Sequence, residues 1–233
     1  MTNSKRNFLI SGISSGIGKA FFELLKSKGE NIIPIVRNKE QASSANLKNA
    51  IVCDFAKPAT IKESFKNLES GVDVFINFAG ILPGKSFLEY EHESIQEVFD
   101  VNIISPLLIT KEITNKLSKN AVLIYIGSVS AQKGSYDDAY AATKGAIHSL
   151  IKSLALKFAP DKRVLGIAPA MMENTRMTDE LIEGRFEHNL KTIPLAKAGN
   201  PKELSELIYF LTGDNCNFMT GALIDINGGQ YLR

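Results

Sequence analysis

A tyrosine and a lysine four residues apart are the pair of side chains in this 233-residue sequence best suited to proton transfer. Tyr140 and Lys144 open a predicted helix, on which residues i and i+4 share one face. A lysine ammonium beside a phenol favours the phenolate, so we expect the pKa of Tyr140 to lie below its usual value of about 10. A phenol tuned in this way can act as a general acid or base near neutral pH.

A serine precedes this pair in the segment Ile126–Ser130. Ser128 ends a predicted strand twelve residues before Tyr140, which leaves enough chain to bring the two side chains together. The Ser128 hydroxyl can then hold a substrate oxygen within reach of the phenol, with Ser130 as a competing candidate. A Ser-His-Asp hydrolase is not expected, because the sequence has no G-x-S-x-G turn and its histidines, such as His148, lack a supporting pattern.

A glycine-rich turn follows the first predicted strand. Glycine lets a backbone approach a phosphate closely, and the N–H groups and dipole at a helix start attract the anion. The spacing is G-x-x-x-G-x-G rather than G-x-G-x-x-G, but its position in the first βα unit indicates a nucleotide site. The residues predicted to contact the nucleotide here are Gly12, Ile13, Ser14, Ser15, Gly16, Ile17 and Gly18.

The end of the second predicted strand concerns the choice of nucleotide. Folds that select NAD place an acid here to bind the ribose 2′-hydroxyl, whereas this sequence has Arg37 and Asn38. Arg37 can bind a 2′-phosphate with two hydrogen bonds, or it can be a solvated surface residue. The sequence therefore favours NADP(H), and NAD(H) stays open.

These residues need a scaffold, and short β-branched runs alternate with longer amphipathic segments along the chain. We predict strands at residues 8–11, 31–36, 50–53, 72–77, 121–126, 163–168 and 222–226. We predict helices at residues 17–28, 60–69, 93–100, 107–117, 139–158 and 201–211, and a loop at 41–49. This alternation implies right-handed βαβ crossovers, and therefore an α/β fold with a parallel sheet of about seven strands covered by helices on both faces. The chemistry-bearing residues then lie at the carboxyl ends of the strands, where such sheets bind ligands.

The composition is that of a globular protein. Hydrophobic residues make up 44% and charged residues 22%, which excludes disordered and fibrous classes. A formal net charge of +2 gives no electrostatic reason to expect nucleic acid or an anionic membrane as a partner. Two cysteines, no apolar run of about 20 residues and no signal-peptide pattern lead us to expect a cytoplasmic protein.

Taken together, these segments resemble the short-chain dehydrogenase/reductase family over nearly the whole chain. The resemblance is carried by Ser11–Gly18 (TGxxxGIG), Cys53–Phe55, Asn77–Gly80 (NNAG), Asn102, Ser128, Tyr140 with Lys144 (YxxxK), Pro169–Ala170 (PG), and a C-terminal signature in residues 199–201 with Glu203, 220–221 and 225–229. It implies one Rossmann-type, doubly wound domain spanning residues 1–233, in a homodimer or homotetramer.

The resemblance also implies a reaction, in which hydride passes between nicotinamide C4 and a carbonyl or alcohol carbon of a small-molecule substrate. Tyr140 would give or take the proton of the substrate oxygen, and Ser128 would position that oxygen. Lys144 would tune Tyr140 and hold the ribose of the cofactor, and Asn102 would support a water path to Lys144. The further cofactor contacts that it implies are Asp54, Phe55, Asn77, Ala79, Gly80, Tyr140, Lys144, Pro169, Met172 and Thr175.

The sequence departs from the family pattern in places. Phe78 replaces the second Asn of NNAG, Ala170 replaces the Gly after Pro169, and Thr175 lies one residue further from that proline than usual. Residues 171–198 are expected to form a mobile substrate lid, or else an amphipathic helix packed on the body. Two rival functions stay open: a dinucleotide-binding sensor or scaffold without turnover, and another nucleotide-cofactor enzyme such as a methyltransferase.

Overall fold

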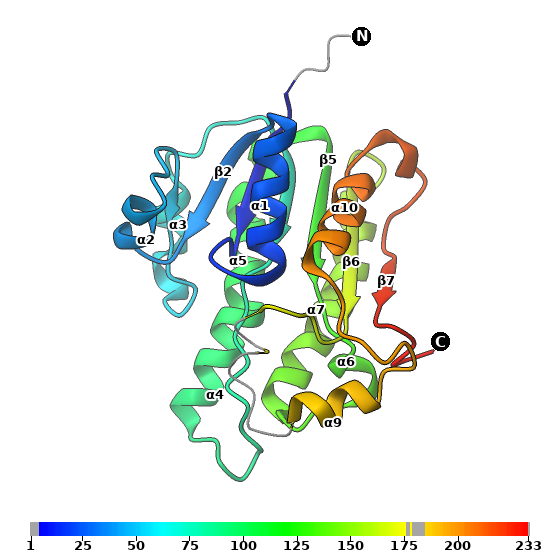
Figure 1. Ribbon diagram of the computed structural model, residues 1–233. Helices are drawn as coiled ribbons and strands as arrows, with labels where there is room; N and C mark the ends of the chain where they lie inside the picture. Colours follow the sequence, from blue (N-terminus) through cyan, green and yellow to red (C-terminus); the bar gives the residue numbers. More distant parts are fainter. Residues whose placement is uncertain (1–4, 176–177, 179–184, 233) are drawn as a thin grey trace.

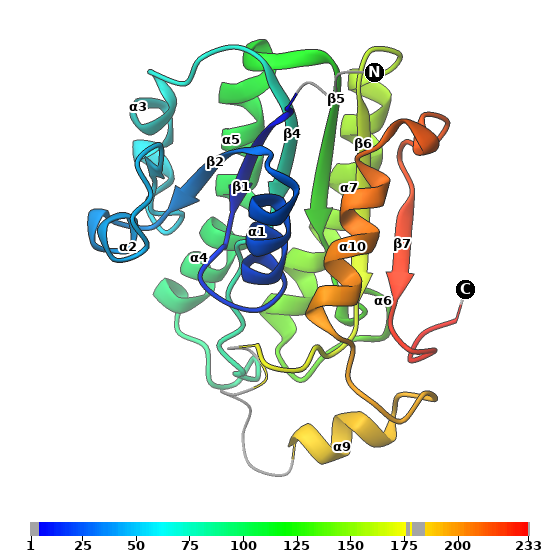
Figure 2. The same cartoon turned by 45° about the horizontal axis from the view of Figure 1, so that its top comes forward.

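One parallel sheet lies between two layers of helices in the computed structural model, which describes residues 5–175, 178 and 185–232 (Figures 1 and 2). In these residues the strand order is β3-β2-β1-β4-β5-β6-β7, and all neighbouring strands are parallel. The strands are β1 (Asn7–Ser11), β2 (Asn31–Val36), β3 (Ile51–Val52), β4 (Val72–Asn77), β5 (Leu117–Ile126), β6 (Arg163–Pro169) and β7 (Leu223–Ile226). The predicted Rossmann-type α/β fold is confirmed.

Helices cover both faces of this sheet. α1 and α10 pack on one face, and α3, α5 and α7 pack on the other (Figures 1 and 2). The α-helices are α1 (Gly16–Lys28), α2 (Lys39–Ser44), α3 (Ile61–Phe65), α4 (His92–Phe99), α5 (Ser105–Ile113), α6 (Ser130–Lys133), α7 (Asp138–Phe158), α9 (Arg185–Lys191) and α10 (Pro201–Leu211). Shorter turns are η1 (Pro58–Thr60), η2 (Asp100–Ile104), η3 (Thr114–Lys116) and η4 (Asp214–Cys216). None of the described helices combines the length and the apolarity of a membrane span.

The first strand shows why the sheet is covered on both sides. Side chains alternate between the faces of a strand, so Phe8 and Ile10 pack with the α1 and α10 side, whereas Leu9 packs with the α5 and α7 side. All three side chains are fully buried. A strand with no polar face must be central in a sheet with both faces covered.

The main differences from the predicted boundaries lie before β5, in the predicted loop at 41–49 and in the helix predicted at 60–69. The helix predicted at 107–117 ends at Ile113, and β5 begins at Leu117, before the exposed residues Lys119 and Asn120 that hid its start in the sequence. The predicted loop at 41–49 overlaps α2, which Asn38 caps by accepting a hydrogen bond from the Gln41 N–H. The helix predicted at 60–69 is shorter, and consists of η1 and α3.

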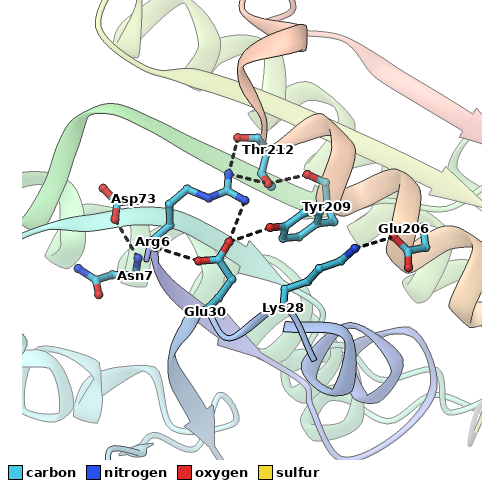
Figure 3. A network of polar contacts seen from close by, with 8 residues as sticks. All are labelled: Arg6, Asn7, Lys28, Glu30, Asp73, Glu206, Tyr209 and Thr212. Carbon is cyan, nitrogen blue, oxygen red and sulfur yellow. Dashed lines mark hydrogen bonds and ion pairs between the residues drawn. The ribbon is translucent and has the colours of Figure 1, made fainter. Parts of the chain in front are cut away.

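A polar network ties the amino end of the sheet together, away from the strand ends where ligands are expected (Figure 3). The Arg6 guanidinium donates to the carbonyl oxygen of Thr212 at 2.8 Å and to Glu30 at 3.3 Å. Glu30 also accepts from the backbone N–H of Arg6 at 2.9 Å and from the Tyr209 hydroxyl at 2.8 Å. The network therefore fixes β1, the end of α1 and α10 relative to one another.

Candidate active site

A cavity of about 1080 Å³ opens at the carboxyl ends of the strands. It exceeds the roughly 300–1,000 Å³ typical of a pocket for one small ligand, so a cofactor and a substrate can share it. Ser128, Tyr140, Lys144 and every predicted cofactor contact except Asn77 line it. Asn77 and Asn102 are buried behind its wall and do not line it.

The glycine turn forms one end of this cavity, between β1 and α1. Gly12 has a φ of +70°, and a Cβ there would lie 2.6 Å from the backbone nitrogen of Ala79. The side chain of Ser15, the N-cap of α1, does not accept from the first turn of the helix, which leaves the N–H groups of that turn for a ligand. These features fit a dinucleotide phosphate, which needs close backbone approach and free N–H donors.

The ends of β1 and β4 are bonded to each other despite the replacement at Phe78. The Ser11 hydroxyl donates to Asn77 Oδ1 at 2.7 Å and accepts from the Ala79 N–H at 3.2 Å. Phe78 instead packs on Phe21, with 5.4 Å between the ring centroids. The turn is thus braced by Ser11 and Asn77, without the second asparagine of the family pattern.

The start of α7 places the reactive pair. Asp137 caps the helix by accepting from the Tyr140 N–H at 2.8 Å, so Tyr140 lies in the first turn and Lys144 in the next. Lys144 Nζ lies 5.5 Å from the centroid of the Tyr140 ring and donates to the Ile126 carbonyl oxygen at 2.8 Å. Ser128 lies close enough to the Tyr140 side chain to affect its pKa, and all three residues line the cavity, so the serine, the tyrosine and the lysine are brought together.

The predicted fall in the pKa of Tyr140 is wrong. Burial raises the pKa of Tyr140 to about 12, the hydrogen bond with Ser128 lowers it, and the negative charge of Asp137 raises it. Burial also lowers the pKa of Lys144 to about 8. The expectation from the sequence considered only the neighbouring ammonium and omitted desolvation, which disfavours the charged form of both groups.

Two contacts fix Ser128. Its hydroxyl oxygen accepts from the Ser130 N–H at 3.0 Å, and its own N–H donates to His148 Nε2 at 3.3 Å. Ser130 also lines the cavity. Because its backbone N–H holds the Ser128 hydroxyl in place, Ser128 is the stronger candidate of the two for binding a substrate oxygen. His148 packs against the Gly127–Ser128 backbone, a role that the sequence did not reveal because the bond is to the main chain.

Asn102 lies in the π-helical turn η2 between α4 and α5. Its Oδ1 accepts from the Ile81 N–H at 2.8 Å, and its Nδ2 donates to the Ile81 carbonyl oxygen at 3.0 Å and to Thr143 Oγ1 at 3.1 Å. Its side chain therefore joins the segment after β4 to α7, on the same turn of α7 as Lys144. The water path to Lys144 stays a prediction.

The part of the cavity near the ends of β2 and β3 carries Arg37 and Asp54. Arg37 follows β2 and is exposed. Its backbone N–H donates to Gln41 Oε1 at 2.9 Å, and its guanidinium takes no part in that hydrogen bond. Asp54 accepts from the Ala56 N–H at 3.1 Å and has Lys57 Nζ at 3.9 Å. The basic side chain at the tip of β2 is thus available to a ligand phosphate.

Another part of the cavity wall is formed by the segment after β6. Ala170 is not among the described residues with positive φ, so its replacement of glycine needs no backbone change. The Thr175 hydroxyl bonds to Thr178 Oγ1 at 2.7 Å, and the Thr175 methyl group lies opposite Gly16. Of the predicted lid at 171–198, residues 176–177 and 179–184 lie outside the described residues.

Several residues line the cavity that the sequence did not single out. They come from the segment after β4, the segment before α7 and the C-terminal end: Leu82, Gly84, Tyr136, Asp137 and Gln230. Two acids, Asp137 and Asp138, precede the helix predicted at 139–158, which is an N-cap signal, but the sequence did not show which of the two caps the helix. The others carry no signal in a single sequence.

The parallel sheet, the glycine turn and the Ser–Tyr–Lys group at one edge are the features of a dinucleotide-dependent oxidoreductase. The chain belongs to the short-chain dehydrogenase/reductase family, since the family model described as Enoyl-(Acyl carrier protein) reductase matches residues 12–230. The 3-oxoacyl-(acyl-carrier-protein) reductase FabG of Buchnera aphidicola subsp. Baizongia pistaciae is 32% identical, with both chains fully covered. Carbonyl reductase family member 4 of Danio rerio is 30% identical over 96% of this chain and 97% of its own.

Solved structures agree with this placement. A short-chain dehydrogenase/reductase from Brucella melitensis, titled as a glucose/ribitol dehydrogenase, superposes with a TM-score of 0.88 at 28% identity, covering 98% of this chain and 97% of its own. The protein is therefore an oxidoreductase that acts on CH–OH or C=O groups of small molecules with a nicotinamide dinucleotide.

Proposed function

We propose that the protein reduces a carbonyl group with NADPH, and that Tyr140 donates the proton. The observation that carries this proposal is that Tyr140, Ser128 and Lys144 line the same cavity as the glycine turn. The raised pKa keeps the proton on the Tyr140 phenol at neutral pH, as a proton donor to a carbonyl oxygen requires.

Each side chain has a distinct part in this reaction. When bound, the nicotinamide dinucleotide supplies a hydride from C4 to the carbonyl carbon of the substrate. Ser128 donates a hydrogen bond to the carbonyl oxygen and orients it, while the Tyr140 hydroxyl gives its proton to the same oxygen. Lys144, held by the Ile126 carbonyl, places its positive charge 5.5 Å from the Tyr140 ring and stabilises the phenolate that is left.

Arg37 supports the choice of NADPH. No carboxylate occupies the tip of β2, and the exposed guanidinium borders the cavity where the adenosine ribose is expected. Arginine matches a phosphate with two parallel hydrogen bonds, so a 2′-phosphate is the natural ligand for it.

The relatives suggest a substrate class. The Buchnera relative is named for the reduction of 3-oxoacyl groups on acyl carrier protein, and the match extends over its full length. We therefore place 3-oxoacyl thioesters first among the carbonyl compounds to be tried.

The test is to offer the protein a panel of 3-oxoacyl thioesters, ketones and aldehydes, and to measure turnover as the loss of NADPH or NADH absorbance. Tyr140→Phe should lower kcat by about 10²–10⁴-fold, the usual contribution of a general acid, while the Kd for NADPH stays within about twofold. Cofactor binding without turnover by the wild-type protein on any compound would instead support a dinucleotide sensor.

We also propose that the whole chain, residues 1–233, forms one catalytic unit and that it assembles as a homodimer or homotetramer, as the resemblance implies. Leu107 on α5 and Leu156 on α7 support this assembly, because they are apolar and exposed at 45% and 84%. Light scattering after gel filtration tests it, and the mass of a single chain would contradict it.

A further inference from the structure

The buried carboxylate of Asp137 connects the start of α7 to the segment after β4. Its Oδ1 accepts from the Tyr140 N–H and from the Tyr90 hydroxyl, each at 2.8 Å, and its Oδ2 accepts from the Gly84 N–H at 2.9 Å. The Asp137 side chain lines the cavity, although the residue is only 1% exposed. A carboxylate with three donors and almost no water must be held rigidly, because losing any donor would leave it unpaired in the interior.

Neighbouring contacts extend this link along residues 84–90. Asp138 Oδ2 accepts from the Phe87 N–H at 2.8 Å, and the Tyr136 hydroxyl donates to Glu89 at 3.0 Å. Gly84 has a φ of +73°, a left-handed conformation that turns its N–H toward Asp137. Gly84 itself lines the cavity, so residues 84–90 begin at its wall.

We propose that Asp137 is a positioning residue, whose carboxylate fixes the backbone of Tyr140 and the segment 84–90 in one arrangement and places a negative charge at the start of α7, where it acts on the Tyr140 phenol through space. This inference rests on the proposed function, since it assigns to Asp137 a part in the same proton transfer. It extends that function to a residue outside the serine, tyrosine and lysine group.

The charges around Tyr140 support the electrostatic half of the inference. Lys144 lies one turn along the same helix with its Nζ 5.5 Å from the ring, and Ser128 of the β5–α6 junction lowers the pKa of Tyr140. From the segment after β4, Tyr90 is bonded to Asp137 and not to Tyr140. Of the acids, Asp137 raises the pKa of Tyr140, after burial as the main cause, and so keeps the proton on the phenol.

Asp137→Asn removes the negative charge and keeps only one of the two acceptor oxygens. The amide oxygen can replace Oδ1 and keep the Tyr140 and Tyr90 bonds, whereas the amide nitrogen then faces the Gly84 N–H, donor against donor. The matched control is Asp138→Asn, in which an exposed side chain loses the same charge one residue away and keeps an oxygen for Phe87.

The experiment measures kinetics, cofactor binding and amide hydrogen exchange of the wild-type protein and both variants. Asp137→Asn should lower kcat by about tenfold to a hundredfold, the cost of a displaced catalytic group, with the Kd for NADPH within about twofold. The alkaline limb of its kcat profile should move to lower pH, and amides in residues 84–90 should exchange faster. Asp138→Asn should stay within about threefold of the wild-type kcat.

Other outcomes overturn the inference. Unchanged kcat and unchanged exchange in Asp137→Asn would do so, as would a lower kcat with an unmoved alkaline limb, which a merely structural defect produces. If Asp137→Asn does not fold, Tyr90→Phe tests the link between Asp137 and residues 84–90, because it removes one hydrogen-bond donor and leaves the charge of Asp137. Faster amide hydrogen exchange in residues 84–90 is expected, and unchanged exchange refutes the link. If the wild-type protein turns over no carbonyl compound, the proposed function fails, while the exchange data still decide the link.

Discussion

Burial of Lys144 should make the stability of the cofactor-free protein depend on pH in a specific way. The pKa of Lys144 is lowered by burial to about 8 in the folded chain, against an ordinary value of 10.5. Below pH 8 the group is protonated in both states, and desolvation of the ammonium costs the folded state about 3 kcal/mol, at about 1.4 kcal/mol per pH unit of difference. As the pH rises through 8, the folded chain releases the proton before the unfolded chain does, so the free energy of unfolding increases.

The comparison with Lys144→Met isolates this effect, because the variant keeps a side chain of similar length without a titrating group. The difference in unfolding free energy, wild type minus variant, should grow by about 2 kcal/mol between pH 8 and 10. Tyr140 acts in the opposite direction, but only above pH 10, where the unfolded phenol ionises before the folded one. Urea unfolding at several pH values and one protein concentration measures the difference. A difference that stays constant from pH 8 to 10 would show that Lys144 keeps its ordinary pKa, and the desolvation argument would fail.

Two further predictions concern the ends of the sheet. Arg37→Asp should shift the ratio of kcat/KM for NADPH over NADH by at least about tenfold toward NADH, because a carboxylate repels the 2′-phosphate. Lys39→Asp, a nearby exposed control, should change this ratio far less. An unchanged ratio in Arg37→Asp refutes the role of Arg37. Glu30→Ala should lower the free energy of unfolding by about 2 kcal/mol and Tm by about 4–8 °C, because Arg6 and Tyr209 lose their shared acceptor. Calorimetry measures the change in Tm, and an unchanged Kd for NADPH is expected, since this network lies at the amino end of the sheet (Figure 3).

The alternation of apolar runs and amphipathic segments was sufficient to predict the class of fold and most of its strands. Val72–Asn77 and Asn31–Val36 were predicted with the bounds that the structure shows, since β-branched runs between turns leave little choice of conformation. The start of β5 was not predicted, because Lys119 and Asn120 carry no strand signal; they lie between the pairs Val72–Leu117 and Val74–Val122, where the register with β4 shifts.

For the site, the sequence by itself was sufficient to predict that Ser128, Tyr140 and Lys144 lie together, since spacing along one helix and position after a strand are local properties. The meeting of Ser128, Tyr140 and Lys144 therefore follows from the order of residues along the chain. Only the tertiary structure decided their proton affinities, because desolvation depends on everything packed around a side chain: it raises the pKa of Tyr140, where the sequence argument predicted a fall. The tertiary structure also supplied Asp137 as the link to residues 84–90, since a hydrogen bond between a side chain and a distant backbone N–H leaves no trace in residue types.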